Sequence, residues 1–288
     1  MIEALRRSIK NTPLPSPSAL QLLERNADPD CELEEIVNIV RCDAALTAKV
    51  LKTVNSAAFG LVTTVESVDR AIYYLGSWLV AGLAIVDSAA QMMQKPLVGY
   101  EGESGTLWRH DLFTAFAARE IAGLGIDEIP TQTAFTAGLL HDIGKALVSE
   151  HLKGTAGQVL KSIEAGDSED YLAAERELLG ADHAEVGFEV AKVWGLPPVL
   201  QQVIRHHHQP DQAPAEVKPL AYAVHLGDLV AMMSGCGTGS DSLQHRLLDG
   251  YADSFRMSPQ VLERVLLEAQ QNFAKAEEAI ALDDKEVP

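Results

Sequence analysis

Residues 134–149 read A-F-T-A-G-L-L-H-D-I-G-K-A-L-V-S and set His141, Asp142 and Lys145 into an otherwise apolar run. Large apolar residues recur there at three- and four-residue steps, which is the spacing of one buried face of a helix. An imidazole beside a carboxylate is costly to bury unless a cation or a hydrogen-bond network meets both groups. The stretch therefore predicts a core helix with a polar site, and a divalent metal ion is one partner that would satisfy it.

The His-Asp dyad needs support from other residues, because such dipeptides occur by chance in many helices. His110 lies in a helix expected over residues 106–124, in line with apolar neighbours, and so is directed inward. Asp228 likewise falls on an apolar row, four residues after Val224. Taken singly, each of these residues is more often a satisfied core residue than a ligand. The metal hypothesis therefore depends on their combination.

Histidines near two helix ends extend the candidate set. Asp182 is suited to cap a helix that begins at His183. The next helix, expected over residues 198–208, ends in three consecutive histidines. One interpretation is structural, since histidine near a helix C-terminus interacts favourably with the helix dipole. The functional interpretation is that His206 and His207 are metal ligands.

The donor types indicate a class of metal. Imidazole and carboxylate ligands without cysteine suit hard or borderline divalent ions, and we expect one or two ions of Mn, Fe, Mg or Ni. The three cysteines, Cys31, Cys42 and Cys236, have no ligand-type spacing. Their scatter is typical of proteins whose thiols stay reduced.

Composition and charge exclude several classes of protein. With 288 residues, 47% of them hydrophobic, the chain can bury a large core and form one large domain or two modest ones. Its net charge of −18 argues against direct nucleic-acid binding and against anionic lipid surfaces, since both need a basic face. The first ten residues lack an apolar signal core, and no apolar run is long enough to span a bilayer. We therefore expect a cytoplasmic protein without a membrane partner.

Helical periodicity extends along the chain, so an all-α fold is predicted. Prolines interrupt residues 13–17, and structure is expected to begin at about Ser18. Short helices are then expected over residues 18–26, 33–41, 44–54, 67–75 and 78–93, with one candidate extended piece at 61–65. The expected division of the chain is a lead-in over 1–13, a helical N-terminal part over 14–95, a connection over 96–105, a helical core over 106–234 and C-terminal helices over 242–288.

Three later segments carry structural interpretations. Residues 167–179 read as a charged helix with a solvated face and an apolar underside. Glycine and serine are frequent in residues 235–242, which indicates a flexible loop. A last long helix starts near Pro259 and is expected to pack on the core or to serve oligomerisation.

The order of the polar residues resembles the ligand order of the HD phosphohydrolase superfamily, which is a histidine, a His-Asp pair and a distant aspartate. In this chain that order is matched by His110, His141, Asp142 and Asp228. The sequence H-D-I-G-K is further similar to the HD-GYP phosphodiesterases, in which a lysine follows the dyad and a later histidine and a His-His pair hold a second metal. The matching places are taken by Lys145, His183, His206 and His207.

This resemblance implies catalytic roles for two residues. Asp142 would bridge two metal ions about 3.5–4 Å apart, which together activate a water for in-line attack on phosphorus. Lys145 would stabilise charge that develops on the phosphoryl oxygens. The H-H-E-x-x-D-G-x-G-Y-P segment of those enzymes is absent, and this chain reads H-H-H-Q-P-D-Q-A-P from His206. The departure weighs against hydrolysis of a cyclic dinucleotide.

The first half of the chain resembles the HDOD family, an HD-related output domain of bacterial signalling proteins. The segments that carry this resemblance are L-P-S-P-S-A-L, C-D-A-A-L-T-A-K-V-L-K-T-V-N-S-A-A-F-G and V-E-S-V-D-R-A-I-Y-Y-L-G. Later in the chain, D-H-A-E-V-G-F-E-V-A-K-V-W-G-L-P-P is similar to the same family. The resemblance covers about residues 14–228. It implies a regulatory module in which a helical N-terminal subdomain packs on an HD-like core with C-terminal helices.

Three functions are compatible with these expectations. The first is a signal-transduction output domain that acts on a signalling or regulatory protein in trans, with any metal in a structural part. The second is a metal-dependent phosphohydrolase or phosphodiesterase for a nucleotide or cyclic nucleotide. The third is a module that binds a nucleotide ligand without cleaving it. The substrate, the metal, the partner, the oligomeric state and the upstream signal stay open.

Overall fold

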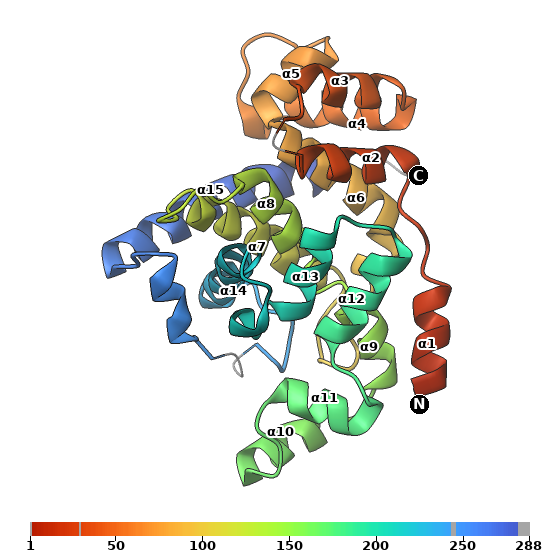
Figure 1. The fold of residues 1–288 in the computed structure, drawn as a ribbon. Helices are drawn as coiled ribbons and strands as arrows, with labels where there is room; N and C mark the ends of the chain where they lie inside the picture. Colours follow the sequence, from red (N-terminus) through yellow and green to blue (C-terminus); the bar gives the residue numbers. More distant parts are fainter. Residues whose placement is uncertain (1, 29, 243–245, 282–288) are drawn as a thin grey trace.

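Helices joined by loops make up the described part of the chain, residues 2–28, 30–242 and 246–281, in the computed structural model (Figure 1). Within these residues the backbone forms no strand, only two isolated antiparallel bridges, Leu97 with Gly102 and Gly125 with Phe255. The predicted all-α class is therefore confirmed, whereas the extended piece expected at 61–65 forms no strand. No helix in the described residues is long and apolar enough to cross a membrane.

The N-terminal helices form a layer at one end of the molecule, at the top of Figure 1. They are α2 (Pro17–Asn26), α3 (Leu33–Arg41), α4 (Ala44–Val54), α5 (Val68–Leu75) and α6 (Ser77–Met93). Side-chain caps determine where three of them begin: Ser16, Asp43 and Ser67 each accept a hydrogen bond from the backbone N–H three residues on. Helix α2 packs on α6, and α3, α4 and α5 pack on one another.

A helix also precedes this layer, so the expectation that structure begins at about Ser18 is wrong. Helix α1 (Ile2–Lys10) lies alongside α9 (Lys145–His151) and α12 (His183–Val193), as Figure 1 shows. Leu5 is buried in this contact, at 3% exposure. So short a helix is marginal by itself and is stabilised by the surface on which it packs. That surface comes from segments far later in the chain. The spacing of Leu5 and Ile9 marks one face of a helix, but it does not show what that face packs on.

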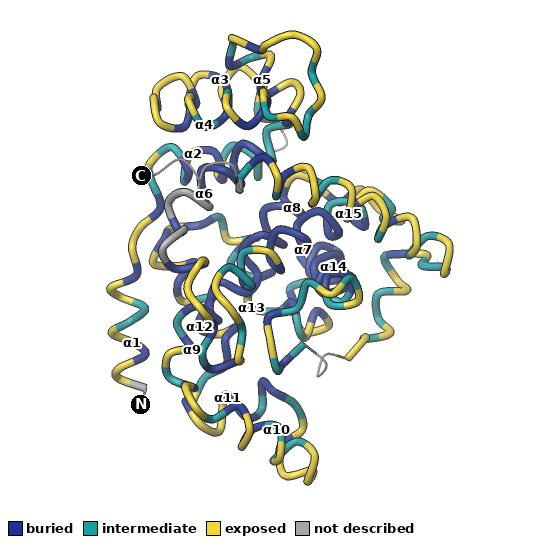
Figure 2. Tube along the Cα trace, turned by 180° about the vertical axis from the view of Figure 1, so that it is seen from behind, coloured by how far each residue is buried: buried dark blue, intermediate teal, exposed yellow. Residues whose placement is uncertain are grey.

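Three helices form the centre of the molecule: α7 (Thr106–Ala122), α8 (Thr131–Leu140) and α14 (Lys218–Met233). Figure 2 shows them buried along most of their length. Glycine lies at their crossings and lets the backbones approach closely. A Cβ on Gly138 would lie 2.7 Å from the Cα of Ala115, and one on Gly227 would lie 2.8 Å from the amide nitrogen of Ala118. The residues that bear functional groups on these helices are therefore held by backbone packing on several sides.

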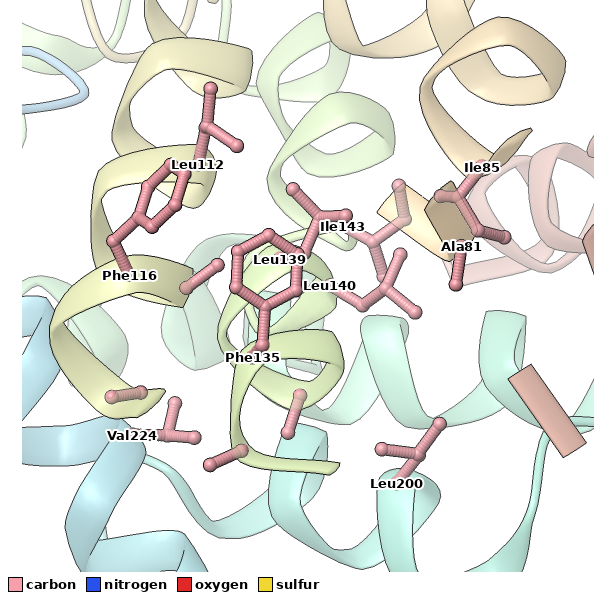
Figure 3. Close-up of a cluster of buried hydrophobic side chains, with 14 of the residues drawn as sticks. Ala81, Ile85, Leu112, Phe116, Phe135, Leu139, Leu140, Ile143, Leu200 and Val224 are labelled. Atoms are coloured by element: carbon pink, nitrogen blue, oxygen red, sulfur yellow. The ribbon is translucent and has the colours of Figure 1, made fainter. Parts of the chain in front are cut away.

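The apolar face predicted for residues 134–149 is part of this core. Phe135, Leu139 and Ile143 are each 1% exposed or less. Figure 3 shows them beside Leu112 and Phe116 of α7. The residues of the predicted face are therefore buried, but so is every other residue of α8 from Thr133 to Leu140, so this helix has no exposed side there.

The same stretch is nevertheless not one continuous helix, as the sequence had suggested. Helix α8 ends just before His141, and α9 begins at Lys145 after a turn. The turn brings Gly144 against the first turn of α12, where a Cβ on Gly144 would contact the carbonyl oxygen of His183. The unbroken helix is therefore wrong, because packing against α12 bends the chain here. The His-Asp dyad consequently lies at a helix junction.

The remaining helices surround this centre. Helix α13 (Pro198–His206) packs on α12, and α15 (Pro259–Ala281) packs on α7, which confirms that the last helix covers the core. Helices α10 (Ala156–Ala165) and α11 (Tyr171–Leu179) form a hairpin that projects from the body at the bottom of Figure 1. The C-terminal section predicted over 242–288 includes residues 243–245 and 282–288, which lie outside the described residues.

Candidate metal centre

Asp142 lies between two groups of buried side chains. We call His110, His141 and Asp228 the α7 group, since they meet where α7, α8 and α14 pack together. The Oδ2 atom of Asp142 faces this group, 3.6 Å from Nε2 of His110 and 3.6 Å from Nε2 of His141. Nε2 of His110 also lies 3.1 Å from Oδ1 of Asp228. Each of these side chains is buried, so the structure brings together the four residues predicted from the HD-like order.

The Oδ1 atom of Asp142 faces a second group. We call His183, His207 and His208 the α12 group, since they come from the start of α12 and from the turn after α13. Nε2 of His183 lies 3.3 Å from this oxygen, and Nε2 of His207 lies 3.5 Å from it. Nε2 of His208 lies 2.8 Å from Nε2 of His183. One carboxylate thus faces both groups through different oxygens, an arrangement that suits a bridging ligand.

The surroundings of His207 are suited to a cation. Its Nδ1 lies 2.7 Å from the carbonyl oxygen of Ile204, which can only accept, so Nδ1 donates. Burial lowers the pKa of His207 to about 4, so the ring is neutral at neutral pH and Nε2 carries a lone pair. That lone pair faces Oδ1 of Asp142, which is also an acceptor. Two buried acceptors that face each other are satisfied by a cation between them.

His110 and His141 are oriented in the same way. Nδ1 of His110 lies 2.7 Å from the carbonyl oxygen of Cys236, and Nδ1 of His141 lies 2.8 Å from that of Gly138. Donation from Nδ1 to a carbonyl presents Nε2 to the centre, as is usual for metal-ligating histidines. Nε2 of His141 is buried and has no hydrogen-bond partner among the described residues. The ring orientations therefore fit ligands.

Both groups fit a divalent cation in spacing and in chemistry. Bonds from such ions to nitrogen or oxygen are about 2.1 Å long, so ligands at right angles lie about 3 Å apart. The ligand atoms of the two groups and Asp142 are 2.8–3.9 Å apart. Two sets of side chains have atoms close enough to share an ion, and Asp142 belongs to both: one adds the α12 group, and the other adds His110, Asp111 and His141, with Asp111 in place of Asp228. The donors are nitrogen and carboxylate oxygen, which suits hard or borderline metals.

The structure places His208 rather than His206 in the α12 group. Helix α13 ends at His206, whose half-buried ring belongs to neither set of candidate ligands. The chain turns directly afterwards, where the amide of Gln209 donates to the carbonyl oxygen of His206 at 2.9 Å. Helical periodicity cannot show which of three consecutive histidines faces the centre when the helix ends among them. The pair that faces His183 is therefore shifted by one residue from the predicted pair.

Lys145 is enclosed beside Asp142. Its Nζ lies 2.6 Å from Oδ2 of Asp142, 2.6 Å from Oδ2 of Asp241 and 3.1 Å from Oγ1 of Thr238. An ammonium group has three N–H donors, and these contacts use all of them. Burial lowers the pKa of Lys145, but the two carboxylates outweigh that effect and raise the pKa above its usual range. The side chain therefore stays charged.

Asp241 and Thr238 belong to the segment 235–242, which was expected to be a flexible loop. Both side chains are buried, at 1% and 2% exposure. The amide of Ser240 donates to the carbonyl oxygen of Tyr100 at 2.7 Å, which fastens the segment to the connection before α7. The segment thus covers the centre. Its glycines and serines signalled the absence of a helix, but they carried no information about which tertiary partners it meets.

Two further carboxylates near the centre were not predicted. Oδ1 of Asp111 lies 3.5 Å from Nδ1 of His141, and burial together with the charge of Asp142 raises the pKa of Asp111 well above its usual range. Glu175 is fully buried against His183, although its helix had been expected to present a solvated face. The position of Asp111, directly after the inward-facing His110, could have indicated that this carboxylate lies near the centre. Glu175 lies among charged residues in the sequence, so nothing in its neighbourhood indicated that it is buried.

Comparison with known proteins places this architecture in a family. The HDOD domain model matches residues 12–210. A curated relative from Treponema pallidum (strain Nichols), named an uncharacterized protein, is 26% identical over 263 residues, which are 91% of this chain and 50% of the relative. The chain thus spans about half the length of that relative.

Solved structures share the fold at low identity. One from Marinobacter aquaeolei VT8, named a candidate signal transduction protein, has a TM-score of 0.74 at 19% identity, over 96% of this chain and 65% of that one. One from Shewanella amazonensis SB2B, named a candidate phosphohydrolase, has a TM-score of 0.61 at 22% identity, over 96% of this chain and 98% of that one. At such identity these likenesses concern the fold alone. Because the HDOD model matches more than half of its residues, the chain belongs to the HDOD family.

Proposed function

We propose that this chain is a regulatory domain that acts through a signalling or regulatory protein and holds one or two divalent ions in its core. The observation that carries the proposal is the enclosure of Lys145 by Asp142, Asp241 and Thr238. A phosphorylated substrate would need this ammonium group to stabilise charge on its phosphoryl oxygens. A lysine that already neutralises two carboxylates offers little to a phosphoryl group. The enclosure therefore supports a structural metal centre over an open active site.

Matched capture experiments test the proposed role. Wild-type protein and the Asp142→Asn variant serve as baits for proteins of the native host, and the complex is then rebuilt from purified components. We expect a signalling or regulatory protein to bind the wild type and to bind the variant more weakly, because the variant lacks an intact centre. Absence of any such partner on the wild-type bait would contradict the proposal. Equal binding of the partner to both baits would show that the partner is recognised without an intact metal centre.

A metal-dependent phosphohydrolase is the second candidate, favoured by the two ligand groups that surround Asp142 beside Lys145. When bound, the ions would supply a water activated for attack on phosphorus. Asp142 would hold both ions, and Lys145 would contact the phosphoryl oxygens once Asp241 had moved away. The Shewanella protein's name fits this candidate.

A panel of nucleotides and cyclic nucleotides with added Mn tests this candidate on wild type and Asp142→Asn. Hydrolysis by the wild type alone would establish the enzyme, and equal residual rates would exclude it. Stabilisation of the fold by a nucleotide without turnover would indicate the nucleotide-sensing alternative, because a ligand that binds only the native state raises the apparent stability.

Asp241→Asn is expected to raise the affinity for inorganic phosphate by about tenfold, which corresponds to about 1.4 kcal/mol. The change removes a negative charge that both neutralises Lys145 and repels an incoming anion. Asparagine keeps the size of the side chain and can still accept the hydrogen bond from Thr238. Isothermal titration of the Mn-loaded protein with phosphate measures the effect. Asp253→Asn, the same change at an exposed residue, is the control, and unchanged phosphate binding in Asp241→Asn would show that Asp241 does not block an anion site.

A further inference from the structure

One carboxylate in the molecule connects the projecting hairpin of α10 and α11 to the centre. Glu175 lies on α11 and is 0% exposed, whereas the next three residues of its helix, 176–178, are exposed. A buried glutamate on a helix of this kind is costly unless its charge is matched by donors. Its surroundings therefore indicate what it does.

Glu175 is held by three donors, two of which belong to His183. Its Oε2 accepts from the backbone amide of His183 at 2.7 Å and lies 2.9 Å from Nδ1 of the same residue. Its Oε1 accepts from the hydroxyl of Tyr100 at 2.6 Å. Both the backbone and the ring of His183 are thus tied to one carboxylate. The ring cannot rotate without breaking this contact.

We infer that Glu175 is the positioning residue of His183 and makes the hairpin of α10 and α11 part of the metal centre. Donation from Nδ1 of His183 to Glu175 leaves Nε2 as the ligand atom, directed at Oδ1 of Asp142. A carboxylate partner also increases the electron density of the imidazole and adds negative charge beside the cation. This inference rests on the proposed metal centre.

The α12 group is distinguished by this carboxylate. Nδ1 of His110, His141 and His207 each has a neutral backbone carbonyl within 2.8 Å. His183 has the carboxylate of Glu175 in that place, on a helix of the projecting hairpin. Loss of the charge on Glu175 should therefore weaken an ion in the α12 group and leave an ion in the α7 group largely unaffected.

The hairpin also reaches the segment that covers the centre. The hydroxyl of Tyr171, one turn before Glu175 on α11, lies 3.0 Å from Oγ of Ser240 and donates to the carbonyl oxygen of Gly99 at 3.3 Å. The hairpin thus contacts His183 and segment 235–242 with the same face. An ion bound to the α12 group should consequently restrain the hairpin, and displacement of the hairpin should weaken that ion.

Glu175→Gln tests the inference, because it removes the charge and keeps the size. We expect affinity for Mn in the α12 group to fall by about ten- to a hundredfold. Metal analysis after dialysis and titration against a competing chelator measure the loss, which should be one ion where wild type holds two. Glu177→Gln is the matched control, since Glu177 is an exposed glutamate on the same helix. It should bind metal as the wild type does.

Amide hydrogen exchange in α11 distinguishes the positioning role from a purely structural one. A residue that only stabilised the fold would not change how exchange responds to Mn. Addition of Mn should slow amide exchange in α11 of the wild type and of Glu177→Gln, but not in Glu175→Gln. If Glu175→Gln folds poorly, Tyr100→Phe replaces it: this variant keeps the carboxylate but loses one of its donors, and it should weaken the coupling between Mn and α11 exchange.

The results distinguish failure of the Glu175 role from failure of the metal centre. If the wild type and Glu175→Gln bind metal with the same stoichiometry and affinity, Glu175 does not position His183, but the metal centre is still supported. Wild type that stays folded and binds no divalent metal would overturn the centre itself, and the positioning role with it.

Discussion

Asp142→Asn is expected to abolish divalent-metal binding by both ligand groups, from as many as two ions per chain to none. The two oxygens of Asp142 face different groups, so a single change reaches both. An amide supplies only one acceptor oxygen, and its N–H donors would point at imidazole lone pairs where a cation should lie. We expect the affinity in each group to fall at least about a hundredfold.

Metal analysis of the purified protein after dialysis against Mn measures this effect, with urea unfolding as the check that the variant is folded. Two histidine variants locate the ligands more sharply. His208→Ala should weaken the α12 group, whereas His206→Ala, the same change two residues earlier, should leave the metal content unchanged. Full metal content in Asp142→Asn, or loss with His206→Ala in place of His208→Ala, would contradict the arrangement around Asp142.

Gly144→Ala is expected to lower the free energy of unfolding by about 3 kcal/mol or more. A Cβ at this position would meet backbone atoms, namely the carbonyl oxygen of His183 and, at 2.6 Å, the amide nitrogen of Gly187. Backbone cannot rotate aside as a flexible side chain can, so α9 and α12 must separate. The separation also moves His183, and we therefore expect the surviving folded protein to bind less metal in the α12 group.

Gly157→Ala is the matched control for this substitution. Gly157 lies in α10, and a Cβ there has no atom within 4 Å. Alanine should therefore stabilise the helix by roughly 0.5–1 kcal/mol. Urea unfolding of both variants measures the difference. Equal stability of Gly144→Ala and wild type would mean that the contact between α9 and α12 is looser than the glycine suggests.

The sequence predicts the helical class, most helix starts, all three members of the α7 group and two of the three members of the α12 group, His183 and His207. Apolar spacing within one helix and a capping residue at its start are local features, and local features suffice to place Asp43 or Ser67 before a helix. An inward histidine such as His110 can be recognised from its apolar neighbours on the same face. The HDOD-like segments supplied the family, because several of them occur in the right order.

The tertiary structure alone decided how these parts meet. The break after α8 results from the approach of α12 to Gly144, and the turn after α13 places His208, and not His206, beside His183. The contacts of Glu175 and Asp241 with the centre join segments far apart in the chain. A charged residue in a polar helix or loop has no periodic pattern that marks it as buried. Its burial is decided by donors from distant segments that match its charge, and only the folded chain brings those donors to it.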